Sequence, residues 1–377
     1  MSKKIIRLSK SCLSNNEKQA VLRVLNHEFL GMGVEVQKFE NELTEFFGRS
    51  VACVSTGTAA LHLALQAVGI GDGDEVLVQS LTYVASFQAI SATGAIPVAC
   101  DVNKDTLCVD WKDAEQKITP KTKAIMPVHY SGGVGALDEV YKFAQKYDLR
   151  VIEDAAHAFG TKYKGKKVGS FGDIACFSFD GIKNITSGEG GCIVTHDAGV
   201  LKKVQEARLL GVENDTEKRF SGERSWNFDV KHQGWRYHMS DIMASIGREQ
   251  LKRFSKFSCN RQRLASLYDS FFVDNLQIIP ISHDYTEVVP HIYVVRIKKM
   301  KNRKLLQEKL LEIGIPTGYH YQPNHLLKYY KNNLHHLPIT ENIFSELLTL
   351  PMHPDISESE IKFISINLIK YVKNVVK

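Results

Sequence analysis

The stretch CFSFDGIKNITSGEGGCIVT (residues 176–195) places a single lysine, Lys183, between an apolar strand and a Gly-Glu-Gly-Gly turn. A lysine in such a place is either a solvated loop residue or an amine held in a pocket for chemistry. An amine that is desolvated and lies near other positive charge loses basicity and becomes a usable nucleophile. The rest of the sequence decides between these two interpretations.

Upstream of this stretch, apolar runs alternate with segments of helical periodicity. Candidate strands lie at 51–55, 75–80, 96–102, 123–130 and 150–156, and candidate helices at 58–69, 84–94 and 137–148. Apolar strands separated by helices predict a mostly parallel sheet that is covered on both faces. Because ligands bind at the carboxyl ends of such strands, the segments 55–58, 80–83 and 154–157 are expected to meet the Lys183 turn.

The regular alternation of apolar runs and helical segments ends at about residue 253. A helix is expected at 260–272, a strand at 291–298, and further helices at 302–314 and 357–375. This pattern is typical of a smaller α+β domain. We therefore predict a large α/β domain over 1–250, with an N-terminal arm over about 1–30, and a small C-terminal domain over 251–377.

Composition excludes several classes of protein. The 377 residues carry a formal charge of only +6, without an arginine–aromatic cluster, which argues against nucleic acid as a partner. The seven cysteines are scattered without a C-x-x-C pair, so no metal site is predicted. No apolar run approaches the roughly 20 residues that a membrane span needs, and no signal peptide is expected at the start. The sequence indicates a cytoplasmic protein without a membrane partner.

A phosphate site is suggested by STGTAAL (residues 55–61), a strand end followed by a glycine and a helix start. Gly57 lets the backbone approach a ligand, and Thr58 adds a hydroxyl at the positive end of the helix dipole. The same residues also occur where a helix is simply capped and no phosphate binds. The nucleotide-binding patterns G-x-x-x-x-G-K-[ST] and G-x-G-x-x-G are not found at a strand–helix junction.

Asp154, in VIEDAAHAFG (residues 151–160), ends a predicted strand. A carboxylate at that depth needs a cation or hydrogen-bond donors. It is a structural cap, a metal ligand together with His157, or the partner of a protonated ring nitrogen.

Binding of pyridoxal phosphate requires a lysine amine, an acid opposite the pyridine nitrogen, a phosphate cup and an aromatic ring that stacks on the cofactor. The predicted strand ends supply all four. The candidates are Lys183, Asp154, Gly57 and Thr58 with Ser178, and Tyr83.

These residues occur in motifs whose order resembles a known family. The motifs are STGTAAL, SLTYVAS, PVHYSG, VIEDAAHAFG, GSFGDIACFSFDGIKNITSGEGG and YHMSDIMASIG. They are similar to those of the DegT/DnrJ/EryC1/StrS sugar-nucleotide aminotransferases, over roughly residues 10 to 375. The resemblance implies an aspartate-aminotransferase-like fold of type I and dependence on pyridoxal phosphate, with pyridoxamine phosphate as the second form of the cofactor.

The resemblance also implies roles for single residues. Lys183 would bond to the cofactor and later move a proton, and Asp154 would keep the ring nitrogen protonated. His157 would lie near the ring hydroxyl and Tyr83 would stack on the ring. The phosphate would be bound by Thr58, Ala59 and Ser178, with Gly57 allowing the approach. His320 and Tyr321, in YHYQPNH, lie where relatives bring a side chain towards the sugar or a phosphate.

One segment departs from the family pattern. Relatives often carry Gly-aromatic-Asn-aromatic-Arg, where the asparagine reaches the phosphate of the neighbouring subunit, whereas this chain has GWRYHM, with Arg236 and His238 at those places. Arg236 can pair with a phosphate as a forked cation. The family precedent implies a homodimer with shared active sites.

The activity implied is transfer of an amino group from L-glutamate, which leaves 2-oxoglutarate, to a nucleotide-linked keto-deoxysugar. The preferred substrate is dTDP-4-keto-6-deoxyglucose, aminated at C4 for O-antigen and lipopolysaccharide synthesis. Amination at C3 and UDP- or GDP-linked substrates are the alternatives. A sugar dehydratase would carry histidine in place of Lys183, and a non-catalytic sensor would lack a catalytic group.

Overall fold

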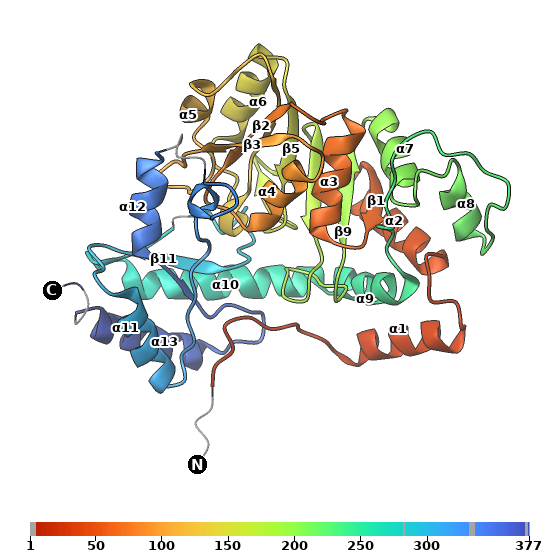
Figure 1. Cartoon of the computed structure of the whole chain (residues 1–377). Coiled ribbons are helices and arrows are strands. Elements are labelled where there is room, and N and C mark those ends of the chain that lie inside the picture. The colour runs from red at the N-terminus through yellow and green to blue at the C-terminus, as the bar shows by residue number, and fades with distance from the viewer. Residues whose placement is uncertain (1–4, 282, 332–335, 374–375, 377) are drawn as a thin grey trace.

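The computed structural model describes residues 5–281, 283–331, 336–373 and 376. Its centre is a seven-stranded sheet in the order β1-β9-β8-β5-β4-β2-β3 (Figure 1). The strands are β1 (Ser50–Val54), β2 (Glu75–Gln79), β3 (Ile96–Cys100), β4 (Thr122–Met126), β5 (Arg150–Asp154), β8 (Ile174–Ser178) and β9 (Gly191–Thr195). The predicted class, a mostly parallel sheet with helices on it, is confirmed.

One strand reverses direction. β9 runs antiparallel to both of its neighbours, β1 and β8, whereas the remaining pairs in this sheet are parallel. The connection from β8 to β9 is the Lys183 turn at 179–190, which contains no helix. A parallel return needs a long crossover, usually with a helix, so this connection brings the chain back antiparallel.

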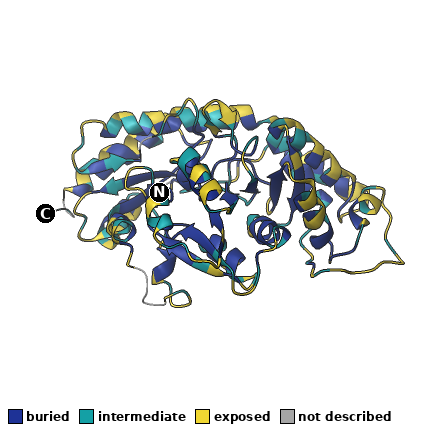
Figure 2. Ribbon diagram, turned by 90° about the horizontal axis from the view of Figure 1, so that it is seen from above, coloured by how far each residue is buried: buried dark blue, intermediate teal, exposed yellow. Residues whose placement is uncertain are grey.

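Helices cover both faces of the sheet. They are α1 (Asn15–Asn26), α2 (Val34–Phe47), α3 (Gly57–Ala67), α4 (Val84–Ser91), α5 (Trp111–Glu115), α6 (Leu137–Lys146), α7 (Ala198–Ala207), α8 (Asp215–Phe220) and α9 (Asp241–Lys252). A two-stranded hairpin, β6 (Lys162–Tyr163) with β7 (Lys166–Lys167), and a 3-10 turn, η1 (Tyr130–Gly132), complete this part. Figure 2 shows the strands in dark blue and the exposed faces of the helices in yellow.

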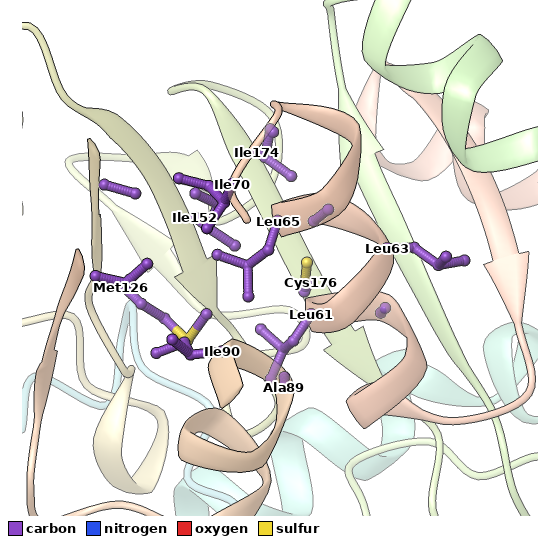
Figure 3. Packing of buried hydrophobic residues seen from close by; sticks show 14 of the residues in the cluster. Leu61, Leu63, Leu65, Ile70, Ala89, Ile90, Met126, Ile152, Ile174 and Cys176 are labelled. Atoms are coloured by element: carbon purple, nitrogen blue, oxygen red, sulfur yellow. The ribbon is translucent and has the colours of Figure 1, made fainter. Parts of the chain in front are cut away.

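Helix α3 is the most deeply placed of these helices because its sequence is apolar almost all round. Its Leu61 and Leu65 share one buried cluster with Ile152 of β5 and Cys176 of β8 (Figure 3). Burial on every side fixes the position of the helix, and therefore of its N-terminus, against the carboxyl end of β8.

The C-terminal part has its own antiparallel sheet, in the order β10-β11-β12. Its elements are α10 (Phe254–Phe272), β10 (Ile278–Pro280), β11 (Tyr293–Ile297), α11 (Arg303–Glu312), η2 (Asn324–Leu326), α12 (Pro338–Glu346), β12 (Leu347–Leu350) and α13 (Glu358–Val372). Residues 374–375 of the helix expected at 357–375 lie outside the described residues. Ile6, from the N-terminal arm, belongs to the core of this C-terminal part, and its N–H donates to the Gly314 carbonyl at 2.9 Å. The boundary near residue 250 stays a prediction.

The described residues offer neither a membrane-crossing helix nor a metal-binding cluster. Across this part of the chain, no helix combines the length and the apolar character that crossing a membrane requires. Within the same ranges, no group of three or more His, Cys, Asp or Glu side chains is arranged to hold a metal ion.

Candidate active site

A cavity of about 420 Å³ lies at the carboxyl ends of β5 and β8. This is the edge at which a parallel sheet binds its ligands. Its lining includes most of the residues singled out in the sequence, namely Gly57, Thr58, Tyr83, Asp154, His157, Ser178, Lys183, His320 and Tyr321. The fold therefore brings together strand ends that lie far apart in the chain.

Lys183 lies in the wall of this cavity, where the residue as a whole is partly exposed but its terminal amine is buried. Burial lowers the pKa of its amine to about 8; Arg261 acts in the same direction, while Asp154 and Asp180 oppose the shift. A pKa near 8 leaves a usable share of neutral amine close to neutral pH, which a nucleophile needs. The interpretation of Lys183 as an amine held in a pocket is the one that this geometry favours.

Asp154 ends β5 and is only 6% exposed. The Ser86 hydroxyl donates to its Oδ2 at 2.7 Å, and the Ala156 N–H donates to its Oδ1 at 3.2 Å. These donors offset the cost of burying a carboxylate. Its neighbour Glu153 points to the other face of the strand, because successive side chains alternate, so Asp154 lines the cavity and Glu153 does not.

His157 is buried between two aromatic partners. Its Nε2 lies 2.9 Å from the Tyr321 hydroxyl, and its ring centroid is 4.5 Å from that of His291. Burial and the nearby Lys183 amine hold the pKa of His157 well below its usual range, so the ring is neutral at physiological pH. Its Nδ1 is buried without a hydrogen-bond partner in the described part of the chain.

The N-terminus of α3 forms a cradle for an anion. The Thr56 hydroxyl accepts from the Ala59 N–H at 3.0 Å, so the helix is capped one residue before Gly57. The first N–H groups of a helix lack acceptors within it, and those of Gly57 and Thr58 lie at the cavity. A Cβ at Gly57 would lie 2.7 Å from the Ser178 Cβ, so only glycine permits this approach. Ala59 itself is buried and does not line the cavity.

Arg236 and His238 do not line the cavity of their own chain. Arg236 is exposed and forms a backbone bridge with Leu209, while His238 forms one with Val54. Burial and the positive charge of Arg236 lower the pKa of His238 to about 4. Their predicted contact with a partner's cofactor stays a prediction.

The sequence model of the DegT/DnrJ/EryC1/StrS aminotransferase family matches residues 11–368. The chain belongs to this family.

This aminotransferase is similar to several proteins of named function or known structure. The spore coat polysaccharide biosynthesis protein SpsC of Bacillus subtilis is 34% identical over 375 residues, which are 97% of this chain and 95% of SpsC. Among solved structures, the putative sugar aminotransferase Spr1654 from Streptococcus pneumoniae, in its PMP form, superposes with a TM-score of 0.91 at 31% identity, covering 99% of this chain and 98% of Spr1654. Helicobacter pylori PseC, an aminotransferase involved in pseudaminic acid biosynthesis, gives a TM-score of 0.91 at 28% identity, with 98% and 100% covered. The predicted family, type I fold and aminotransferase activity are confirmed.

Three residues of this aminotransferase site were not predicted from the sequence. Ser86, which donates to Asp154, ends the motif SLTYVAS and lies one helical turn after Thr82, so its position on α4 gave a usable signal. Arg261 and His291 gave none, because they come from the C-terminal part. The Arg261 guanidinium donates to the His291 carbonyl at 2.8 Å, which holds the His291 ring against His157.

Proposed function

We propose that this sugar aminotransferase moves an amino group from L-glutamate to C4 of dTDP-4-keto-6-deoxyglucose, which yields a 4-amino-4,6-dideoxyhexose for surface polysaccharide such as O-antigen and lipopolysaccharide. The proposal rests on one cavity, which brings together the Lys183 amine with its lowered pKa, the buried Asp154 carboxylate and the anion cradle at Gly57. SpsC and PseC, named for polysaccharide and amino-sugar synthesis, support the sugar class of substrate.

The cofactor is pyridoxal phosphate, and Spr1654 has been solved in both PLP and PMP forms. The residues present fit this group, because glycine at 57 leaves the space that a phosphate would need beside Ser178, and Asp154 brings a desolvated carboxylate to the same cavity. When bound, the cofactor supplies an electron sink that stabilises negative charge on the carbon next to the transferred nitrogen.

The chain's own groups would then act as follows. The Lys183 amine would bond to the cofactor, and after its release would carry the proton to and from the reacting carbon. Asp154 would hold a proton on the ring nitrogen, and its bond from Ser86 would fix its orientation. Gly57, Thr58 and Ser178 would bind the phosphate. Tyr83, 59% exposed at the cavity and 5.5 Å from the Tyr321 ring, would cover the cofactor ring.

His320 and Tyr321 are the proposed contacts to the substrate. Both come from the C-terminal part and line the cavity, where the Tyr321 hydroxyl lies 2.9 Å from His157 Nε2. The His320 Nδ1 lies 2.8 Å from the Thr349 hydroxyl, and burial lowers the pKa of His320 to about 4, so the ring is a neutral hydrogen-bonding group.

The alternatives concern substrate and chemistry. Amination at C3 and UDP- or GDP-linked 4-keto sugars use the same machinery with a different sugar orientation or nucleotide. A sugar dehydratase is disfavoured because Lys183 is present, and a non-catalytic sensor because Lys183 and Asp154 share one cavity with the cradle.

Incubation with glutamate and a panel of 3-keto- and 4-keto-deoxysugar nucleotides tests this function. We expect glutamate alone to bleach the visible band of the loaded enzyme, and the dTDP-4-keto sugar to give the 4-amino product, identified by mass and NMR. Amination of another member of the panel would replace the proposed substrate, and loss of water without nitrogen transfer would replace the proposed reaction.

A homodimer with shared active sites is the assembly that we propose. Arg236→Ala and Lys183→Ala variants, each expected to be strongly impaired, are mixed after partial denaturation and refolded together. If Arg236 serves the partner's site, half of the dimers are mixed and each has one intact site, so about a quarter of wild-type activity returns. If both residues serve the same chain, refolding together restores nothing. Refolding each variant alone is the control.

A further inference from the structure

A short segment near the N-terminus, residues 6–12, is called the strap here. Figure 1 shows it as the red trace that leads from the blue C-terminal helices towards α1. Its first half is bound to the C-terminal part. The Met352 N–H donates to the Leu8 carbonyl at 3.0 Å, and the Lys10 Nζ pairs with Asp355 at 2.6 Å. The strap therefore follows the position of the C-terminal part.

The second half of the strap is bound to the large sheet and its helices. The Ser11 hydroxyl donates to the Gly181 carbonyl at 2.5 Å. The Cys12 carbonyl accepts from Gln250 Nε2 at 3.0 Å, and the Cys12 side chain belongs to the core beneath the sheet. The contact with Gly181 falls two residues before Lys183.

Other segments bind the Lys183 turn on both sides of Lys183 in the sequence. After Lys183, Asn184 Nδ2 donates to the Phe159 and Val289 carbonyls at 3.2 and 3.3 Å. Before Lys183, the turn bonds to itself, because the Ile182 and Lys183 N–H groups donate to Asp180 at 3.1 and 3.0 Å. To these bonds Ser11 adds the one from a distant segment, at the Gly181 carbonyl.

The strap also contacts the segment that carries His320. A Cβ at Gly318 would lie 3.3 Å from Leu8 Cδ2, so Leu8 packs directly on the backbone there. Gly318 pairs with Thr349 and comes two residues before His320, which lines the cavity. Leu8 and Ser11, three residues apart, therefore contact the walls that carry His320 and Lys183.

We propose that the strap holds these two walls of the active site in register and that Ser11 is the positioning residue which keeps the Lys183 amine in its buried place. This rests on the proposed role of Lys183 as the amine that bonds to the cofactor. Loss of the Ser11 hydroxyl frees the Gly181 carbonyl, and the turn then relaxes towards solvent.

The test measures Lys183 in the cofactor-free protein by trace acetylation with acetic anhydride across pH, quantified by mass spectrometry. In the wild type, labelling of Lys183 is expected to be half-maximal near pH 8, as the pKa of its buried amine implies. In Ser11→Ala, we expect the midpoint to rise by about 0.5 to 1 pH unit towards that of an ordinary lysine, the shift that one net hydrogen bond is worth.

Matched variants separate positioning from general damage. Ser11→Thr keeps the hydroxyl, and its extra methyl meets solvent because Ser11 is exposed, so the midpoint should return to the wild-type value. Ser9→Ala removes a hydroxyl from the same strap that makes no hydrogen bond with the described residues, and should change nothing. Asp355→Asn breaks the ion pair with Lys10 and should move the midpoint in the same direction as Ser11→Ala.

A wild-type midpoint in Ser11→Ala would overturn the proposal. Failure of the proposed function gives a different result, because borohydride reduction of the loaded wild-type enzyme would then leave no cofactor adduct on Lys183.

Discussion

Lys183→Arg abolishes transamination: we expect the rate of glutamate-dependent product formation to fall by roughly 10⁴-fold, the upper end for a positioned acid–base group. Arginine keeps a positive charge beside Asp154 and Asp180, so neither carboxylate loses a cation. Its guanidinium stays protonated at any pH a protein tolerates, and so cannot act as a nucleophile or give up a proton. The measurement is steady-state product formation, together with peptide mapping after borohydride reduction, which should find the adduct on Lys183 of the wild type.

Lys167→Arg is the matched control for this variant. Lys167 is another partly buried lysine whose pKa is lowered by desolvation. Its Nζ lies over the Phe46 ring at 4.0 Å and donates to the Phe46 carbonyl at 2.8 Å, and neither residue lines the cavity. Activity should be kept in Lys167→Arg. Product formation by Lys183→Arg at a rate close to that of this control, or an adduct on a different lysine, would refute the assignment.

Asp154→Asn is expected to reduce kcat/KM by roughly 10²- to 10⁴-fold, because removal of one partner of a buried charge pair costs about 3–5 kcal/mol. Asparagine has nearly the same shape and can still accept the hydrogen bond that Ser86 donates. The change therefore removes the charge that would keep a proton on the cofactor's ring nitrogen and leaves the packing in place. Kinetics of both half-reactions, followed by the visible spectrum, measure the effect.

The neighbouring carboxylate provides the control for Asp154. Glu153 is fully buried and bonds to His129 Nε2 at 2.6 Å and to the Tyr141 hydroxyl at 2.5 Å, on the face of β5 away from the cavity. Glu153→Gln should lower the melting temperature, because a buried network loses its charge, and should leave kcat of the folded enzyme little changed. Equal losses of kcat in the two variants would show that Asp154 acts through the fold and not at the cofactor.

Most of the large sheet was predictable because its strands are short apolar runs bounded by turn residues. The expected strands at 75–80 and 150–156 appear as β2 and β5, within a few residues of the predicted bounds. The antiparallel direction of β9 was not predicted, because it depends on how the 179–190 turn connects two strands. Periodicity of side chains says nothing about strand direction.

The residues of the candidate site were likewise predictable only in part. The local sequence was enough to predict the strand-end residues, since each lies at or after the end of an apolar run, where parallel strands bind ligands; they are Lys183, Asp154, Gly57 and Ser178. His291 could not be predicted, because it reaches His157 only through the packing of the C-terminal part against the large sheet. A histidine in an apolar run has the same local sequence whether it packs in a core or beside a catalytic group.

The sequence determined which chemical groups are available, because it places a glycine-led helix start, an aspartate and a lysine at the ends of three separate apolar runs. The tertiary structure decided how reactive those groups are. The Ser86 hydroxyl that donates to Asp154 lies 68 residues away in the chain, and the Ser11 hydroxyl that donates to Gly181 lies 170 residues away. The Lys183 amine is likewise desolvated only in the folded chain. Solvent exclusion is a property of that packing, and no local stretch of sequence contains it.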